Sequence, residues 1–156
     1  MKTLLAIALL AFSSVTWADT FEEDWAYVCS EMAVDCTDIA PPTLVEDTSL
    51  GAALNMNVLQ GLLGYYDVYN TRNTIALDPL LRLFPDIREA VIVHEMAHYL
   101  DDWDGVSLYD EYDQSAGNGW CATEEKAHTV EHKWLIVHGK WRVAKEDRNW
   151  REWYGC

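Results

Sequence analysis

The hydrophobic positions along the chain predict several helices, with a few short strands after the first. Residues 19–36 carry apolar side chains at intervals of three and four, which is the period of an amphipathic helix. The expected helices cover residues 19–36, 86–100, 120–138 and 141–154. Residues 48–64 combine helically spaced leucines with interrupting glycines and give no clear prediction, and the polar, acidic residues 101–118 are expected to form a loop.

Three short runs between the first two helices are expected to be strands. Residues 43–45 begin the first of them. Residues 65–69 and 74–77 are rich in tyrosine and β-branched side chains and flank a polar turn, which is typical of a β-hairpin. Pro79 ends the second arm, because proline cannot continue a strand ladder. Strands and helices in this order predict the α+β class, with a small sheet that contains an antiparallel pair.

The N-terminus has the pattern of a secretory signal peptide. Lys2 precedes an apolar run, and small residues at Thr16 and Ala18 suit cleavage after Ala18. The run is too short to span a bilayer, so a retained anchor is the weaker alternative. We therefore expect one domain at residues 19–156, secreted or periplasmic and not embedded in a membrane.

The charge balance limits the possible partners. Asp and Glu number 26 against 11 Lys and Arg, for a formal net charge of −15. Such a surface repels phosphate backbones and anionic lipids, so no nucleic acid partner is expected. It would attract basic peptides, although acidity is also an ordinary route to solubility. The oligomeric state is left open.

The four cysteines are Cys29, Cys36, Cys121 and Cys156. An even number behind a signal peptide indicates disulfides, for which three pairings exist. We expect Cys29 with Cys36 as a short local loop and Cys121 with Cys156 as a tie for the C-terminal segment. A zinc site built from cysteine and histidine is the weaker alternative, because no Cys-x-x-Cys spacing is present.

The helix expected at residues 86–100 contains the sequence His94-Glu95-Met96-Ala97-His98. Asp86 and Glu89 after Pro85 have the pattern of a capping box, which puts the motif in the middle of a largely apolar helix. The imidazoles of positions i and i+4 then project from one face and can bind one metal ion. The alternative without metal binding is an ordinary pair of core histidines beside a solvated glutamate.

The residue types suit a catalytic zinc ion. Zinc in such sites has three protein ligands and a water molecule whose pKa it lowers to about 7. Glu95 would take the proton of this zinc-activated water and pass it to the leaving amine. The strongest candidate for the third ligand is Glu124, near the start of the next long helix. Glu125 is the fallback, one residue out of register.

The strand, the motif helix and Glu124-x-x-Ala127 on the following helix resemble a gluzincin-type zinc metallopeptidase domain, as in small secreted bacterial zincin-like proteins. The resemblance covers roughly residues 65 to 135. It implies a zincin-like fold in which His94, His98 and Glu124 bind one Zn²⁺ ion and Glu95 is the general base. It also implies that the strand of Ile75 is the sheet edge that binds a peptide substrate.

One departure from that family concerns His128, which stands where related enzymes often have an aspartate that orients a ligand histidine. Metal-bound histidines usually need an acceptor on their other nitrogen, so the second shell of this site is left open. His128 is either part of that shell, a group that steadies the oxyanion, or a polar residue without a role.

Two rival spacings are present. Asp104 lies where a metzincin-like pattern has its third ligand, but Asp101 replaces the glycine that this pattern needs for its turn. Residues 128–132 read His-Thr-Val-Glu-His, which matches an inverted zinc motif. Inverted-motif enzymes take a further glutamate from well downstream, and little chain follows His132, so we interpret the match as coincidence.

The leading hypothesis is therefore a secreted or periplasmic zinc peptidase that hydrolyses peptide bonds in a peptide or protein substrate. The alternative is a catalytically inactive zincin-fold module that binds zinc and a partner. An amidase that acts on cell-wall peptides is a third and weaker reading, which the expected compartment permits and no residue requires.

Overall fold

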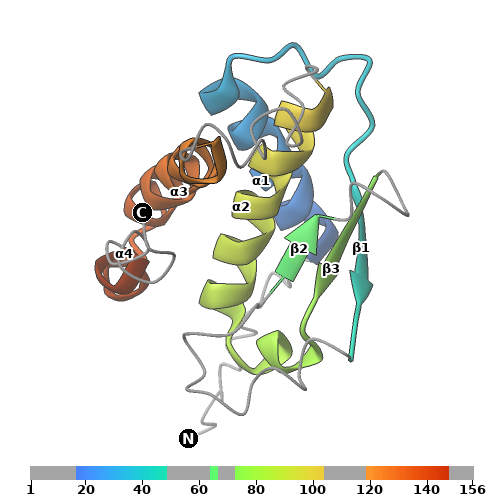
Figure 1. Ribbon diagram of the computed structural model, residues 1–156. Helices are drawn as coiled ribbons and strands as arrows, with labels where there is room; N and C mark the ends of the chain where they lie inside the picture. Colours follow the sequence, from blue (N-terminus) through green and yellow to red (C-terminus); the bar gives the residue numbers. More distant parts are fainter. Residues whose placement is uncertain (1–16, 49–63, 67–72, 104–118, 148–156) are drawn as a thin grey trace, which may run out of the picture.

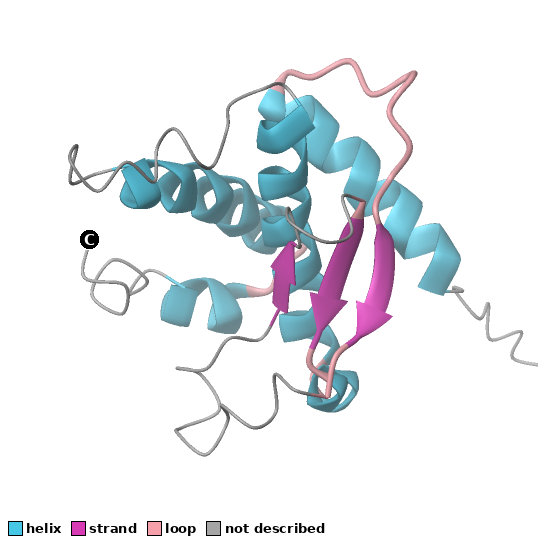
Figure 2. Ribbon diagram, turned by 45° about the vertical axis from the view of Figure 1, so that its right-hand side comes forward, coloured by secondary structure: helices cyan, strands magenta, loops and turns pink. Residues whose placement is uncertain are grey.

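The computed structural model describes residues 17–48, 64–66, 73–103 and 119–147. It has the expected α+β class, with helices packed on one side of a small mixed sheet (Figures 1 and 2). In chain order the elements are α1 (Trp17–Met32), β1 (Thr43–Glu46), β2 (Gly64–Tyr66), β3 (Thr74–Leu77), the 3-10 helix η2 (Pro79–Leu83), α2 (Pro85–Trp103), α3 (Gly119–Val137) and α4 (Trp141–Asp147). Most of the ambiguous range 48–64 and of the expected loop 101–118 lies outside the described residues.

The three strands are ordered β1-β3-β2, with β1 parallel and β2 antiparallel to β3. The antiparallel pair confirms the expected hairpin partners, and β3 ends just before Asp78, whose carboxylate accepts a hydrogen bond from the Leu80 N–H at 2.8 Å. The expectation that the strand of Ile75 is a sheet edge is wrong. This strand is β3, which has a partner on each side, and its three last residues are buried. The outer strands of the described sheet are β1 and β2.

Helix α2 lies at the centre of the fold. It contacts α1, α3, η2, β2 and β3, and Figure 1 shows it between the sheet and α3. Residues 92–101 are all buried, so the helix is enclosed on every side, as expected for a helix hydrophobic over most of its surface. Polar side chains on such a helix need partners from its neighbours.

Both ends of α2 differ from the expectation. The Phe84 carbonyl accepts the first hydrogen bonds of the helix, from the N–H groups of Ile87 and Arg88. Asp86 binds Lys140, just before α4, in place of capping the helix. At the other end, α2 continues through Trp103, into the expected loop. Asp101 is buried there and binds Lys126 of α3, which gives the last turn of α2 a partner inside the protein.

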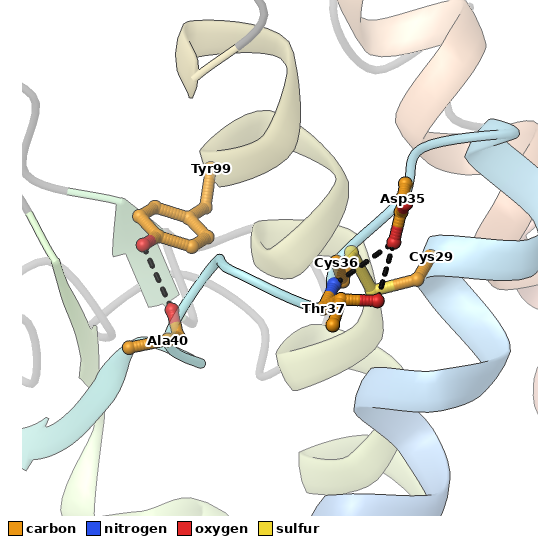
Figure 3. Close-up of a disulfide and its surroundings, with 6 residues drawn as sticks. All are labelled: Cys29, Asp35, Cys36, Thr37, Ala40 and Tyr99. Atoms are coloured by element: carbon orange, nitrogen blue, oxygen red, sulfur yellow. Dashed lines mark hydrogen bonds between the residues drawn. A yellow bond between two sulfur atoms is a disulfide. The ribbon is translucent and has the colours of Figure 1, made fainter.

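Helix α1 is fixed by a local disulfide and by its contact with α2. Cys29 near its end bonds to Cys36 with an S–S distance of 2.08 Å, which confirms the first expected pair (Figure 3). Beyond it, the Tyr99 hydroxyl of α2 donates to the Ala40 carbonyl at 2.9 Å and holds the connection to β1. The second expected pair, Cys121 with Cys156, includes a residue outside the described part of the chain.

A buried acid joins α1 to α3. The Asp24 carboxylate accepts a hydrogen bond from the Trp134 indole N–H at 2.8 Å, and both side chains are buried. Burial raises the pKa of Asp24 to about 6, with the Trp134 bond opposing and the negative charge of Glu89 adding to the shift. The ionised carboxylate is therefore a destabilising group at neutral pH.

The close approach of β2 to α2 depends on Gly64. A Cβ atom at this position would lie 2.6 Å from Val91 Cγ1 and 3.2 Å from the Ala76 carbonyl oxygen. We predict that Gly64→Ala lowers the free energy of unfolding by about 1–3 kcal/mol in urea denaturation, because the strand or the helix has to move. Val91→Ala in the same chain should recover part of the loss. Equal losses with and without Val91→Ala would contradict this contact as the cause.

The raised pKa of Asp24 predicts the sign of a pH effect. The folded chain binds this proton more tightly than the unfolded chain, whose Asp has a pKa near 3.8, so stability from this group is present below pH 4 and lost as the pH rises through 6. Asp24→Asn should match the wild type near pH 4 and exceed it by about 2–3 kcal/mol at pH 7. Urea denaturation of metal-free protein across this range is the measurement. Exposed Glu22→Gln is the control, and a pH-independent difference for Asp24→Asn would contradict the assignment.

Candidate metal centre

The two motif histidines lie one turn apart on α2 and face the same neighbour, α3. Both side chains are buried, and the His94 Nε2 and His98 Nε2 atoms are 3.1 Å apart. The i, i+4 spacing explains why they share a face. Apolar residues of α2 surround them, so their nitrogens point into the interface between the helices.

Helix α3 brings Glu124 to this pair. Its Oε2 lies 3.3 Å from His94 Nε2, its Oε1 lies 3.4 Å from His98 Nε2, and the residue is only 3% exposed. The structure therefore brings together the three residues that the sequence suggested as ligands. Their donor atoms form a group within 4.8 Å of one another.

The separations suit a metal ion. Donors at zinc distances of about 2.0–2.2 Å in a tetrahedral site are about 3.3 Å from one another. The two imidazole nitrogens are 3.1 Å apart, and each lies 3.3 or 3.4 Å from a different oxygen of Glu124, which is close to this value. In addition, Glu124 Oε2 is buried and makes no hydrogen bond to any of the described residues, although an imidazole nitrogen faces it. His94, His98 and Glu124 can thus hold a metal ion, and two imidazoles with one carboxylate favour a transition metal over Ca²⁺ or Mg²⁺.

Glu95 lies next to this group and is held by the sheet. Its Oε2 accepts a hydrogen bond from the backbone N–H of Tyr66 in β2 at 2.9 Å. The Tyr66 hydroxyl donates to Asp102 at 2.8 Å, so β2 is attached to α2 at two points. Burial raises the pKa of Glu95, which the nearby His94 partly opposes. A carboxylate with a raised pKa in a fixed position is suited to proton transfer.

Glu131 belongs to the site, and the sequence interpretation missed it. One oxygen, Oε2, lies 3.0 Å from His94 Nδ1 and 3.0 Å from His128 Nδ1. It therefore supplies the acceptor that a ligand histidine usually needs. The signal was available in the spacing: Glu124, His128 and Glu131 are at i, i+4 and i+7, which is one face of a helix.

His128 stands beside the ligand group. Its ring packs edge-on against His94, with 4.4 Å between ring centroids, and its Nε2 is 3.8 Å from Glu124 Oε2. With Glu131 and His94 it forms a second set of possible ligands, which shares His94 with the first. The position that carries an aspartate in the resembled family is thus a histidine here, and the carboxylate is found one turn further along α3.

The charges of the cluster suit a cation. Burial raises the pKa of Glu124, but its contacts with His94 and His98 outweigh burial and bring that pKa below its ordinary value. The pKa of Glu131 is also lowered, because bonds to His128 and His94 outweigh burial. Burial lowers the pKa of His94, but Glu124 and Glu131 more than offset it and raise that pKa well above its usual value. A metal ion therefore has to displace a proton from His94.

The remaining candidates lie elsewhere or outside the described residues. Glu125, the fallback ligand, has an exposed side chain and does not face α2, because one residue along a helix is a large rotation. His132 is half-buried and belongs to neither group of possible ligands among the described residues. Asp104, the rival from the metzincin-like spacing, lies outside the described part of the chain.

Comparison of the chain with protein families, with curated proteins and with solved structures gave no match. Within the part of the chain that the structure describes, no helix is long and apolar enough to cross a membrane. The function has to be inferred from the side chains of the site, since a fold alone does not define an activity.

The ligand group predicts which glutamate the metal needs. We expect about one zinc per chain in protein that begins at residue 19, as measured by atomic absorption after gel filtration. Glu124→Ala should lose it, because a buried donor disappears, whereas Glu125→Ala on the same helix should keep it. Retention of zinc by Glu124→Ala would contradict the assignment, and loss in Asp104→Ala would indicate the rival ligand.

Proposed function

We propose that the protein is a zinc-dependent peptidase in which His94, His98 and Glu124 hold the ion and Glu95 is the general base. One observation carries the proposal: two buried imidazoles and a buried carboxylate have their nearest donor atoms 3.1–3.4 Å apart, close to the separations of a zinc tetrahedron, and Glu95 adjoins them without belonging to the ligand group. Three protein ligands leave a coordination position for water or substrate, as in catalytic zinc sites. This arrangement resembles the site of a gluzincin-type zinc metallopeptidase domain.

The zinc ion, when bound, would polarise the scissile carbonyl and acidify the attacking water. The protein supplies the proton transfers. Glu95 accepts the proton of the water at its carboxylate and later gives it to the leaving amine. The Tyr66 N–H bond to Oε2 restricts the carboxylate and leaves Oε1 as the second oxygen for this transfer. Such a fixed orientation favours reaction, because the group need not be ordered in each turnover.

The substrate in this proposal is an extended peptide that lies along β2. The Tyr66 N–H is directed to Glu95, so the outer edge of β2 faces the general base. Backbone groups on an outer strand can pair with an added strand, which would place a peptide bond of the substrate near the ion. In this proposal β2 takes the role that the sequence analysis gave to the strand of Ile75.

An oxidising compartment is compatible with the observed disulfide between Cys29 and Cys36. Together with the apolar N-terminal run, it supports our proposal that the protein is exported. Secretion into the medium or the periplasm and cleavage after Ala18 are part of this proposal.

The test is the isosteric change Glu95→Gln, measured with zinc-loaded protein and a library of quenched fluorescent peptides. We predict that cleavage falls by about 10²–10⁴-fold, because the amide cannot take the proton, while zinc content is unchanged. Glu89→Gln is the matched control, since Glu89 lies on the same helix and faces Lys140 at 3.9 Å instead of the site.

Two results would contradict the proposal. Undiminished cleavage by Glu95→Gln would remove Glu95 from the mechanism. A zinc-loaded wild type that cleaves no peptide in the library would favour the alternative, a zinc-binding module without turnover. Release of soluble fragments from cell-wall peptides would instead point to the amidase.

A further inference from the structure

We propose that Glu131 is a positioning residue that fixes two imidazoles with a single oxygen: His94, a ligand, and His128, which stands beside the ligands without being one. This inference deepens the proposed function, since it rests on the same metal site. It assigns a role to the carboxylate on α3 that the sequence pattern left unexplained.

The first step is the hydrogen-bond chemistry of a carboxylate. Glu131 Oε2 is 3.0 Å from the Nδ1 atoms of both His94 and His128, and the three residues are buried. An ionised carboxylate can only accept hydrogen bonds. Both Nδ1 atoms therefore have to carry the proton, and in the neutral rings both Nε2 atoms are unprotonated.

The second step concerns the direction in which the Nε2 atoms lie. The Nε2 of His94 is the atom in the ligand group, 3.3 Å from Glu124 Oε2. Once the ring is neutral, Glu131 keeps its remaining proton on Nδ1, so His94 offers the Nε2 lone pair to the metal without changing tautomer. The ring is also held in orientation by the same bond, so less ordering is required when the ion binds.

The third step separates His128 from the ligands. Its Nε2 is 3.8 Å from Glu124 Oε2, longer than the 3.1–3.4 Å separations of the ligand group, and its own set of possible ligands contains Glu131 but not His98. His128 thus donates the second hydrogen bond to Glu131 and packs against the ring of His94. In this way His128 orients the Glu131 carboxylate, which in turn orients the ligand His94.

In the metal-free protein with neutral imidazoles, the proton of His98 is expected on the other nitrogen from that of His94 and His128. His94 Nε2 and His98 Nε2 are 3.1 Å apart, and if the former is an acceptor the latter has to be the donor. His98 Nδ1 is then the unprotonated atom, which agrees with its lack of a hydrogen-bond partner among the described residues. Zinc should therefore move the His98 proton from Nε2 to Nδ1, while the protons of His94 and His128 stay on Nδ1.

The test begins with long-range ¹H–¹⁵N spectra of the wild-type full-length mature protein, without metal and with one equivalent of zinc, at a pH where the imidazoles are neutral. We expect Nδ1–H signals for His94 and His128 in both states and a change of tautomer at His98 on zinc binding. A neutral Nε2–H form at His94 or His128 in the metal-free protein would overturn the inference, and this measurement needs no variant.

The second measurement is zinc affinity by competition with a chelator. Glu131→Gln should weaken zinc binding about 10–100-fold, as is typical when the partner of a ligand histidine is lost, because the amide can rotate and donate. Glu125→Gln, exposed on the same helix, should leave it unchanged. His128→Gln should weaken zinc binding by less than Glu131→Gln does. An unaltered affinity in Glu131→Gln, with its fold verified by circular dichroism, would overturn the inference. The inference would also be overturned if His128→Gln lost as much zinc affinity as Glu124→Ala, because His128 would then be a ligand.

These outcomes differ from those that decide the proposed function. If zinc binds but no peptide is cleaved, the peptidase proposal fails and the role of Glu131 is still decided by affinity. If zinc does not bind, both fail, because His94 is then not a ligand.

Discussion

The polar side chains buried between α2 and α3 have to find their partners inside the protein, and this constraint determines how the two helices meet. An imidazole or carboxylate removed from water without a partner costs several kcal/mol. His94 meets this requirement through Glu131 on Nδ1, while its Nε2 pairs with His98 Nε2 and faces Glu124 at 3.3 Å. The carboxylates are spaced along α3 so that both reach one ring of α2. A shift of α3 by one residue would turn both away from it, so the geometry of the site and the packing of the helices are the same feature.

The rest of the fold supports this interface from the other side. The sheet covers the face of α2 next to β2, where Gly64 permits a close approach. Helix α1 packs against α2 and is joined to α3 through the buried pair of Asp24 and Trp134. Since α2 is in contact with every one of these layers, the histidines are held by a rigid helix rather than by a loop, which suits the positional demands of a metal site.

Periodicity predicted the helices and the strands well, and the number and spacing of the cysteines predicted the local disulfide, because all of these depend on neighbours in sequence. It also predicted that His94, His98 and Glu124 would share a site, since helical spacing puts the pair on one face and the next helix can supply a carboxylate. The order of strands was not predictable. The parallel pairing of β1 with β3 joins segments far apart in sequence, and nothing local in residues 74–77 distinguishes a central strand from an edge. Glu131 was missed for a different reason, because a match to an inverted motif drew attention to His132 rather than to the face shared with Glu124.

The contact between Tyr66 and Glu95 has a consequence for mutational robustness. The donor is a backbone N–H group, which every amino acid except proline possesses. Side chains at position 66 can therefore vary without removing the hydrogen bond itself, although the hydroxyl contact with Asp102 would be lost. The orientation of the glutamate is thus encoded in the path of the chain and not in the identity of its neighbour. Sequence change along β2 could alter what the outer strand contacts while leaving the carboxylate in place.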